Sequence, residues 1–123
     1  MDNRIRFTVE AARRTAAAIG SDKVGIRLSP YGVFNGTVAD AQTDAVYTKL
    51  TQELSKLKLL YIHVIDHSAM GAPKPKPELI HAMRAADPGG SIDVLHAGRE
   101  GLHRLPLTAP SRSPLGVPVG FDR

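Results

Sequence analysis

An arginine stands within one of the most apolar short stretches of the sequence, and its position is the first indication of chemistry. Arg27 lies in residues 23–29 (KVGIRLS), which otherwise have the pattern of a buried strand that ends before Pro30. A charged side chain is costly to bury unless an anion meets it. Because side chains alternate along a strand, Gly25 is expected on the same face, where it leaves room beside a permanently charged guanidinium.

Three surroundings for Arg27 are open from the pattern alone. The first is an anionic ligand, because parallel α/β folds bind ligands outside the carboxyl ends of their strands and Arg27 lies near such an end. The second is a carboxylate from a neighbouring strand, for which Asp66 is a candidate. The third is solvent, which a long side chain can reach past a short strand.

A second group of polar residues lies in and after residues 59–66 (LLYIHVID), the next predicted strand. His63 lies within this strand, and Asp66 and His67 lie at its end. A spacing of four between two histidines suits a metal site on a helix, whereas this segment is predicted as a strand, so no metal site is expected. The sequence shows no Ser-His-Asp arrangement and no phosphate-binding glycine loop. We therefore assign no catalytic residue and no metal ligand.

Alternating helices and strands are expected to position these residues. Apolar residues recur at helical spacing in three segments and form short apolar runs in three others. The expected helices begin near Asp2, near Thr43 or Asp44, and at Pro77, and the expected strands lie in residues 23–29, 59–66 and 89–98. Asp2 or Asn3 can cap the first helix, and Gly20 can end it in a left-handed conformation. This order implies parallel strand pairing and an α/β fold.

Composition limits the classes of function. The chain has 123 residues, of which 42% are hydrophobic, which is enough for one modest domain with a core. It has no cysteine, which excludes thiol catalysis and fits a cytoplasmic setting. No apolar run approaches the ~18 residues that span a bilayer, so no membrane partner is expected. The net charge of +4 comes from scattered basic residues without interleaved aromatics, and nucleic acid is therefore not an expected partner.

The last segment of the chain differs in character from the rest. Residues 98–123 contain proline, arginine and serine without helical or strand periodicity. We therefore divide the chain into residues 1–97, an α/β segment, and residues 98–123, an irregular C-terminal tail. The tail is expected to be disordered or to be foreign to the fold, for example through a shifted reading frame.

Four motifs occur in order along the first half of the chain. They are Asn3, Arg4, Arg6 and Phe7; Val24, Gly25, Arg27, Ser29 and Pro30; Gly32 and Phe34; and Tyr61, His63 and Val64. This series resembles the Old Yellow Enzyme family of FMN-dependent NAD(P)H oxidoreductases. The family reads Glu-Asn-Arg-x-Arg-Phe on a helix, Val-Gly-x-Arg-x-Ser-Pro on a strand, Gly-x-Phe in a loop and Tyr-x-His-Val on the next strand.

The resemblance implies a fold, a cofactor and a reaction. The fold would be a partial (β/α)8 TIM barrel, from roughly the fourth helix to the seventh strand. Arg27 would be a cofactor-binding residue that hydrogen-bonds the N1/C2=O edge of the flavin and stabilises the negative charge that reduction places there. Phe34 and Asn35 would lie in the loop beside the substrate pocket. The reaction would pass a hydride from NAD(P)H to FMN and then to an activated alkene or similar acceptor.

The resemblance also shows where this sequence departs from the family. The family's substrate-binding pair, its proton-donating tyrosine and its FMN-phosphate loops lie outside the matched segment. Lys58 stands where the family usually has a glycine, and it would cost about 1 kcal/mol if that position needs a positive φ. Two interpretations are therefore open. The first is an FMN-dependent oxidoreductase that is incomplete in this chain. The second is an inert truncated or frame-shifted remnant that does not hold FMN by itself and at most associates weakly with a complementary barrel fragment.

Overall fold

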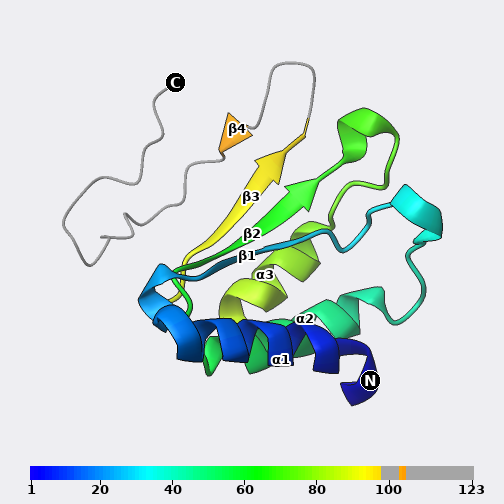
Figure 1. The fold of residues 1–123 in the computed structure, drawn as a ribbon. Helices are drawn as coiled ribbons and strands as arrows, with labels where there is room; N and C mark the ends of the chain where they lie inside the picture. The colour runs from blue at the N-terminus through cyan, green and yellow to red at the C-terminus, as the bar shows by residue number, and fades with distance from the viewer. Residues whose placement is uncertain (98–102, 105–123) are drawn as a thin grey trace.

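The computed structural model describes residues 1–97 and the backbone of a two-residue strand at His103–Arg104 (Figure 1). The helices are α1 (Asp2–Ile19), α2 (Thr43–Ser55) and α3 (Pro77–Ala86), and the strands are β1 (Gly25–Leu28), β2 (Tyr61–Asp66), β3 (Ile92–His96) and β4 (His103–Arg104). The predicted alternation of helix and strand through β3 is confirmed.

The strands form one sheet in the order β1-β2-β3-β4. β1 pairs with β2 in parallel, and β2 pairs with β3 in parallel, as predicted. β4 pairs antiparallel with the end of β3, and this strand was not predicted because two residues are too few to show a periodicity. The remainder of the predicted tail, residues 98–102 and 105–123, lies outside the described residues.

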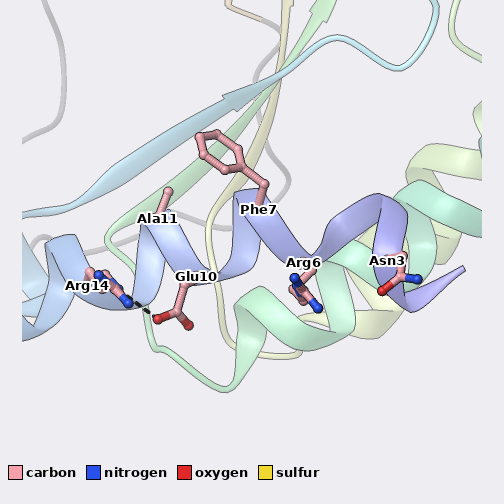
Figure 2. Close-up of a pocket in the computed structure, with 6 residues that line it drawn as sticks. All are labelled: Asn3, Arg6, Phe7, Glu10, Ala11 and Arg14. Carbon is pink, nitrogen blue, oxygen red and sulfur yellow. Dashed lines mark hydrogen bonds and ion pairs between the residues drawn. The ribbon is translucent and has the colours of Figure 1, made fainter.

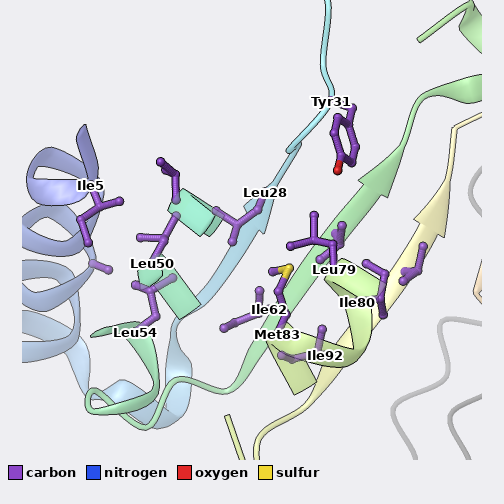
Figure 3. Packing of buried hydrophobic residues seen from close by; sticks show 14 residues of the cluster. Ile5, Leu28, Tyr31, Leu50, Leu54, Ile62, Leu79, Ile80, Met83 and Ile92 are labelled. Carbon is purple, nitrogen blue, oxygen red and sulfur yellow. The ribbon is translucent and has the colours of Figure 1, made fainter. Parts of the chain in front are cut away.

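The hydrophobic core lies between the sheet and the three helices, which all pack against the same face of the sheet (Figures 1 and 3). Leu54 of α2, Val64 of β2 and Met83 of α3 are at most 1% exposed. The other face of the sheet is covered by no described helix, and we call it the open face. It carries Gly25, Arg27, Tyr61, His63 and Asp93, because these residues alternate with the core residues along their strands.

β1 is the edge strand of the described sheet, and this corrects the expectation of a buried strand around Arg27. Only Leu28 is buried in β1, Ile26 packs partly against the core, and Gly25 and Arg27 are exposed. The apolar residues of β1 therefore face the core on one side of the sheet, and β1 pairs with one described strand, β2. The sequence pattern could not show this, because an edge strand and a central strand can carry the same apolar residues.

The ends of the helices agree only in part with the expected capping residues. Met1 is the N-cap of α1 and no side chain caps this helix, so Asp2 lies in the first turn, where its charge suits the helix dipole. Gly20 ends α1 with a φ of 95° and a ψ of 132°, a positive φ outside the left-handed helical region. Pro77 occupies the first turn of α3, as predicted.

Lys58 has a φ of 54°, which confirms the suspected backbone strain after α2. This residue follows the helix in a turn where the Lys58 amide donates to the Ser55 carbonyl over 3.2 Å. Left-handed backbone is unfavourable for a lysine and free of cost for a glycine. In the part of the chain that the structure describes, no helix is long and apolar enough to cross a membrane.

Candidate functional site

Arg27 lies on the open face, near the carboxyl end of β1. Its side chain is exposed, and within residues 1–97 no hydrogen bond or ion pair to its guanidinium is found. The space over Gly25 is filled by the Tyr61 ring, with which a Cβ at this glycine would collide. Gly25 therefore makes room for a side chain of β2. This corrects the expectation that Gly25 leaves space for a ligand beside Arg27, because the Tyr61 ring occupies that space.

Asp66 does not pair with Arg27, although both lie toward the carboxyl ends of the strands. Its side chain is on the helix-covered side of β2, on the same face of the strand as the core residues, and it is 1% exposed. Asp66 Oδ1 accepts a hydrogen bond from the Ser68 backbone amide over 2.8 Å, and Oδ2 lies 2.9 Å from His96 Nδ1. The predicted alternative of an Arg27–Asp66 ion pair is therefore wrong.

The environment of Asp66 favours its charged form. Burial alone would raise the pKa of Asp66. The hydrogen bonds from the Ser68 hydroxyl and amide, together with His96, outweigh burial and hold this pKa below its usual range. Asp66 is thus a carboxylate that ties the end of β2 to the end of β3.

Phe34 reaches the carboxyl end of β2, where its ring meets His67. The two ring centroids are 5.3 Å apart in an edge-to-face arrangement, and Phe34 is 44% exposed. His67 Nε2 also lies 3.3 Å from Ser29 Oγ at the end of β1. The structure therefore gathers Ser29, Phe34 and His67 at one edge of the sheet. Asn35 beside Phe34 is exposed and has a φ of 56°, a conformation that asparagine tolerates.

The loop that carries Phe34 is anchored where it leaves β1. The Tyr31 hydroxyl donates a hydrogen bond to Asp44 of α2, and the Tyr47 hydroxyl donates to the Ser29 carbonyl over 3.3 Å. Burial and the nearby Asp44 charge raise the pKa of Tyr31, so its hydroxyl stays protonated and keeps this donor role. These contacts fix the start of the loop and so direct Phe34 toward His67.

Sequence reasoning missed the contact of Ser29 with His67. The two residues are 38 positions apart, and only the parallel pairing of β1 and β2 brings their ends together. The available signal was that Ser29 ends one predicted strand and His67 directly follows the next, and the carboxyl ends of parallel strands meet at one edge of a sheet.

A surface hollow on α1 lies away from these residues. Asn3, Arg6, Phe7, Glu10, Ala11 and Arg14 line it, all from one helix (Figure 2). Glu10 is bridged by Arg13 and Arg14, and these hydrogen bonds lower its pKa to about 2. Such exposed helical ion pairs are ordinary surface features. The strand ends and the open face are therefore the candidate site.

Parts of two known reductases are similar in sequence to this chain. A 12-oxophytodienoate reductase-like protein of Solanum lycopersicum is 42% identical over 64 residues, which are 52% of this chain and 17% of that protein. The aldehyde reductase FrzD of a Cladobotryum species is 29% identical over 107 residues, covering 81% of this chain and 28% of that protein. No protein-family model matches the chain.

The fold is similar to that of a solved structure described as the crystal structure of TcOYE with pHBA. The TM-score is 0.62 at 23% sequence identity, over 80% of this chain and 25% of that one. The described part of the chain therefore has the fold of a segment of a TIM barrel, with three parallel strands and their helices. The chain spans less than a third of the length of these similar proteins.

Proposed function

We propose that this chain, whose sequence and fold are Old Yellow Enzyme-like, is a flavin-contacting part of an FMN-dependent NAD(P)H oxidoreductase of the ene-reductase type. The observation that carries the proposal is the exposed guanidinium of Arg27 on the open face, which forms no hydrogen bond or ion pair with the residues that the structure describes. It lies within the strand motif that resembles the family, at the end of the sheet where parallel α/β folds bind ligands.

The residues present fit one edge of a flavin ring. Arg27 supplies a planar, permanently charged pair of donors, which suits the N1/C2=O edge of an isoalloxazine. Because this edge becomes more negative when the ring is reduced, Arg27 would bind reduced FMN more tightly than oxidised FMN. Bound FMN would supply the hydride transfer from NAD(P)H to an activated alkene or similar acceptor.

Phe34 and Asn35 are proposed to line the acceptor side of the same site. Phe34 offers a half-exposed apolar ring at the strand ends, held edge-on by His67. Such a ring suits the apolar body of an alkene acceptor. Ser29 holds His67 and thereby supports the position of Phe34.

The remaining contacts of a flavin site would come from a complementary barrel segment. The outer edge of β1 has no partner strand among the described residues, so its backbone groups can pair with a further parallel strand. We propose association along this edge.

The test is a titration of the chain with oxidised and with dithionite-reduced FMN, monitored by NMR at the Arg27 side chain. We expect reduced FMN to shift these signals at about tenfold lower concentration than oxidised FMN, because the charge-assisted hydrogen bond strengthens. Arg27→Ala should abolish the preference, whereas Arg84→Ala, which removes an exposed cation of α3, should leave it unchanged. Equal or undetectable response to both forms would contradict the proposal and favour the inert remnant.

A further inference from the structure

Arg27, His63 and Asp93 form a row across the open face. Arg27 is the register partner of His63, and His63 is the register partner of Asp93. The three residues come from three adjacent parallel strands, which lie about 4.8 Å apart. A permanent cation, a titratable imidazole and a carboxylate therefore stand side by side. We call this set the Arg27–His63–Asp93 row.

Tyr61 and Asp93 both contact the imidazole in this row. The Tyr61 ring stacks on the His63 ring with centroids 4.0 Å apart and planes 18° apart. His63 Nε2 lies 4.0 Å from Asp93 Oδ2, and Asp93 is 4% exposed. A buried carboxylate beside an imidazole stabilises the protonated ring. Tyr61 and Asp93 thus hold the plane of the His63 ring, and Asp93 also favours its charge.

Arg27 acts on His63 in the opposite sense. Two like charges on adjacent strands repel, so the guanidinium disfavours protonation of His63 while no anion is present. An anion bound at Arg27 would remove this repulsion and would itself attract the protonated ring. Protonation of His63 and binding of an anion at Arg27 are therefore coupled, and by linkage each strengthens the other.

We propose that Arg27 and His63 form a paired anion-binding site on the open face, in which Asp93 positions His63. The site takes planar ligands with delocalised negative charge, the chemistry that a carboxylate and the reduced edge of a flavin share. Its identification as a flavin contact rests on the proposed function, whereas binding of a simple planar anion does not. His63 makes this binding stronger at acid than at alkaline pH.

The test uses benzoate, a planar anion without a flavin, added to the full chain and followed by NMR at Arg27 and His63. We expect the apparent dissociation constant to be about tenfold lower at about pH 5.5 than at about pH 8, on either side of the histidine range. His63→Gln should remove this pH dependence, and Arg27→Ala should weaken binding at both values. Arg84→Ala controls for non-specific attraction by surface charge.

The coupling within the Arg27–His63–Asp93 row can also be measured without a ligand, from the midpoint of the His63 titration. Arg27→Ala should raise the midpoint of the His63 titration, and Asp93→Asn should lower it. If Asp93→Asn does not fold, the Arg27 and His63 variants still decide the question. Equal benzoate affinity at both pH values in the unaltered chain, or a His63 midpoint unmoved by Arg27→Ala, would overturn the inference.

The same titration with FMN separates this inference from the proposed function. Benzoate binding that depends on pH, together with no response to oxidised or reduced FMN, would retain the paired site and reject the flavin role. A response to FMN that depends on Arg27 but does not change with pH or with His63→Gln would retain the flavin role and reject the paired site.

Discussion

Asp66 shows how one residue can join two strands and make the stability of the fold depend on pH. It is almost completely buried, and its carboxylate oxygens meet Ser68 and His96. Its pKa is held below the usual aspartate range in the folded chain. A depressed pKa contributes stability that is present above the unfolded-state value of about 3.9 and is lost as the pH falls below it.

We predict that Asp66→Asn lowers the free energy of unfolding at about pH 7 by about 1–3 kcal/mol, because a buried charge-assisted contact is lost. The difference from the unaltered chain should shrink as the pH falls below about 4, where the carboxylate of the unaltered chain also becomes protonated. Urea unfolding at several pH values measures this. Asp22→Asn, at an exposed position, is the control and should change little. A difference that is constant with pH would contradict the role assigned to Asp66.

Replacing Lys58 is expected to raise the free energy of unfolding, whereas replacing Asp66 is expected to lower it. Because its φ is 54°, Lys58→Gly should raise the free energy of unfolding by about 1 kcal/mol. Lys56→Gly, two residues earlier at a φ of −63°, should instead lower it by about 0.5–1 kcal/mol. Thermal or urea unfolding of both variants checks the pair. Two changes of the same sign would show that loss of the lysine charge, rather than backbone conformation, sets the effect.

At the scale of an element, α1 carries apolar residues that are buried on one side of the helix and exposed on another. Ile5 and Ala12 are buried in the core cluster, whereas Phe7 on the same helix is 85% exposed (Figures 2 and 3). Phe7 belongs to the motif that resembles the family, although it contributes almost no burial in this chain. The side of α1 that carries Ile5 and Ala12 therefore holds the helix against the core, and Phe7 does not contribute to this packing.

Two side-chain truncations on α1 should show that only its buried side contributes to the free energy of unfolding. Ile5→Ala removes a side chain that is 4% exposed and should lower the free energy of unfolding by about 2–4 kcal/mol. Phe7→Ala should change it by no more than about 0.5 kcal/mol, because the ring is already in water. Chemical unfolding of both variants measures the contrast. A large loss with Phe7→Ala would mean that the ring packs in solution.

At the scale of the whole molecule, the proposed flavin site is a partial one. The chain spans 17% and 28% of the two similar reductases and 25% of the solved barrel. Among residues 1–97, Arg27 is the direct flavin contact that we propose. Charge-assisted hydrogen bonds contribute about 1.5–3 kcal/mol each, whereas a micromolar complex needs about 8 kcal/mol net.

The purified chain is therefore expected not to hold FMN stoichiometrically. Its visible absorbance should lack a flavin band, and fluorescence titration should show no saturation in the micromolar range, because one guanidinium cannot immobilise the ligand. Addition of a complementary barrel segment that pairs with β1 should strengthen binding. A yellow protein with one flavin per chain, which loses the flavin on Arg27→Ala, would contradict this expectation.

The sequence by itself determined the parallel α/β alternation and the face shared by Gly25 and Arg27. These features follow from local periodicity and backbone preference, which a short stretch of residues carries. Only the tertiary structure decided that β1 is an edge strand, that Asp66 meets His96 and that Phe34 meets His67. The physical reason is that these contacts depend on which strands become neighbours and in what register, and residues far apart along the chain set both.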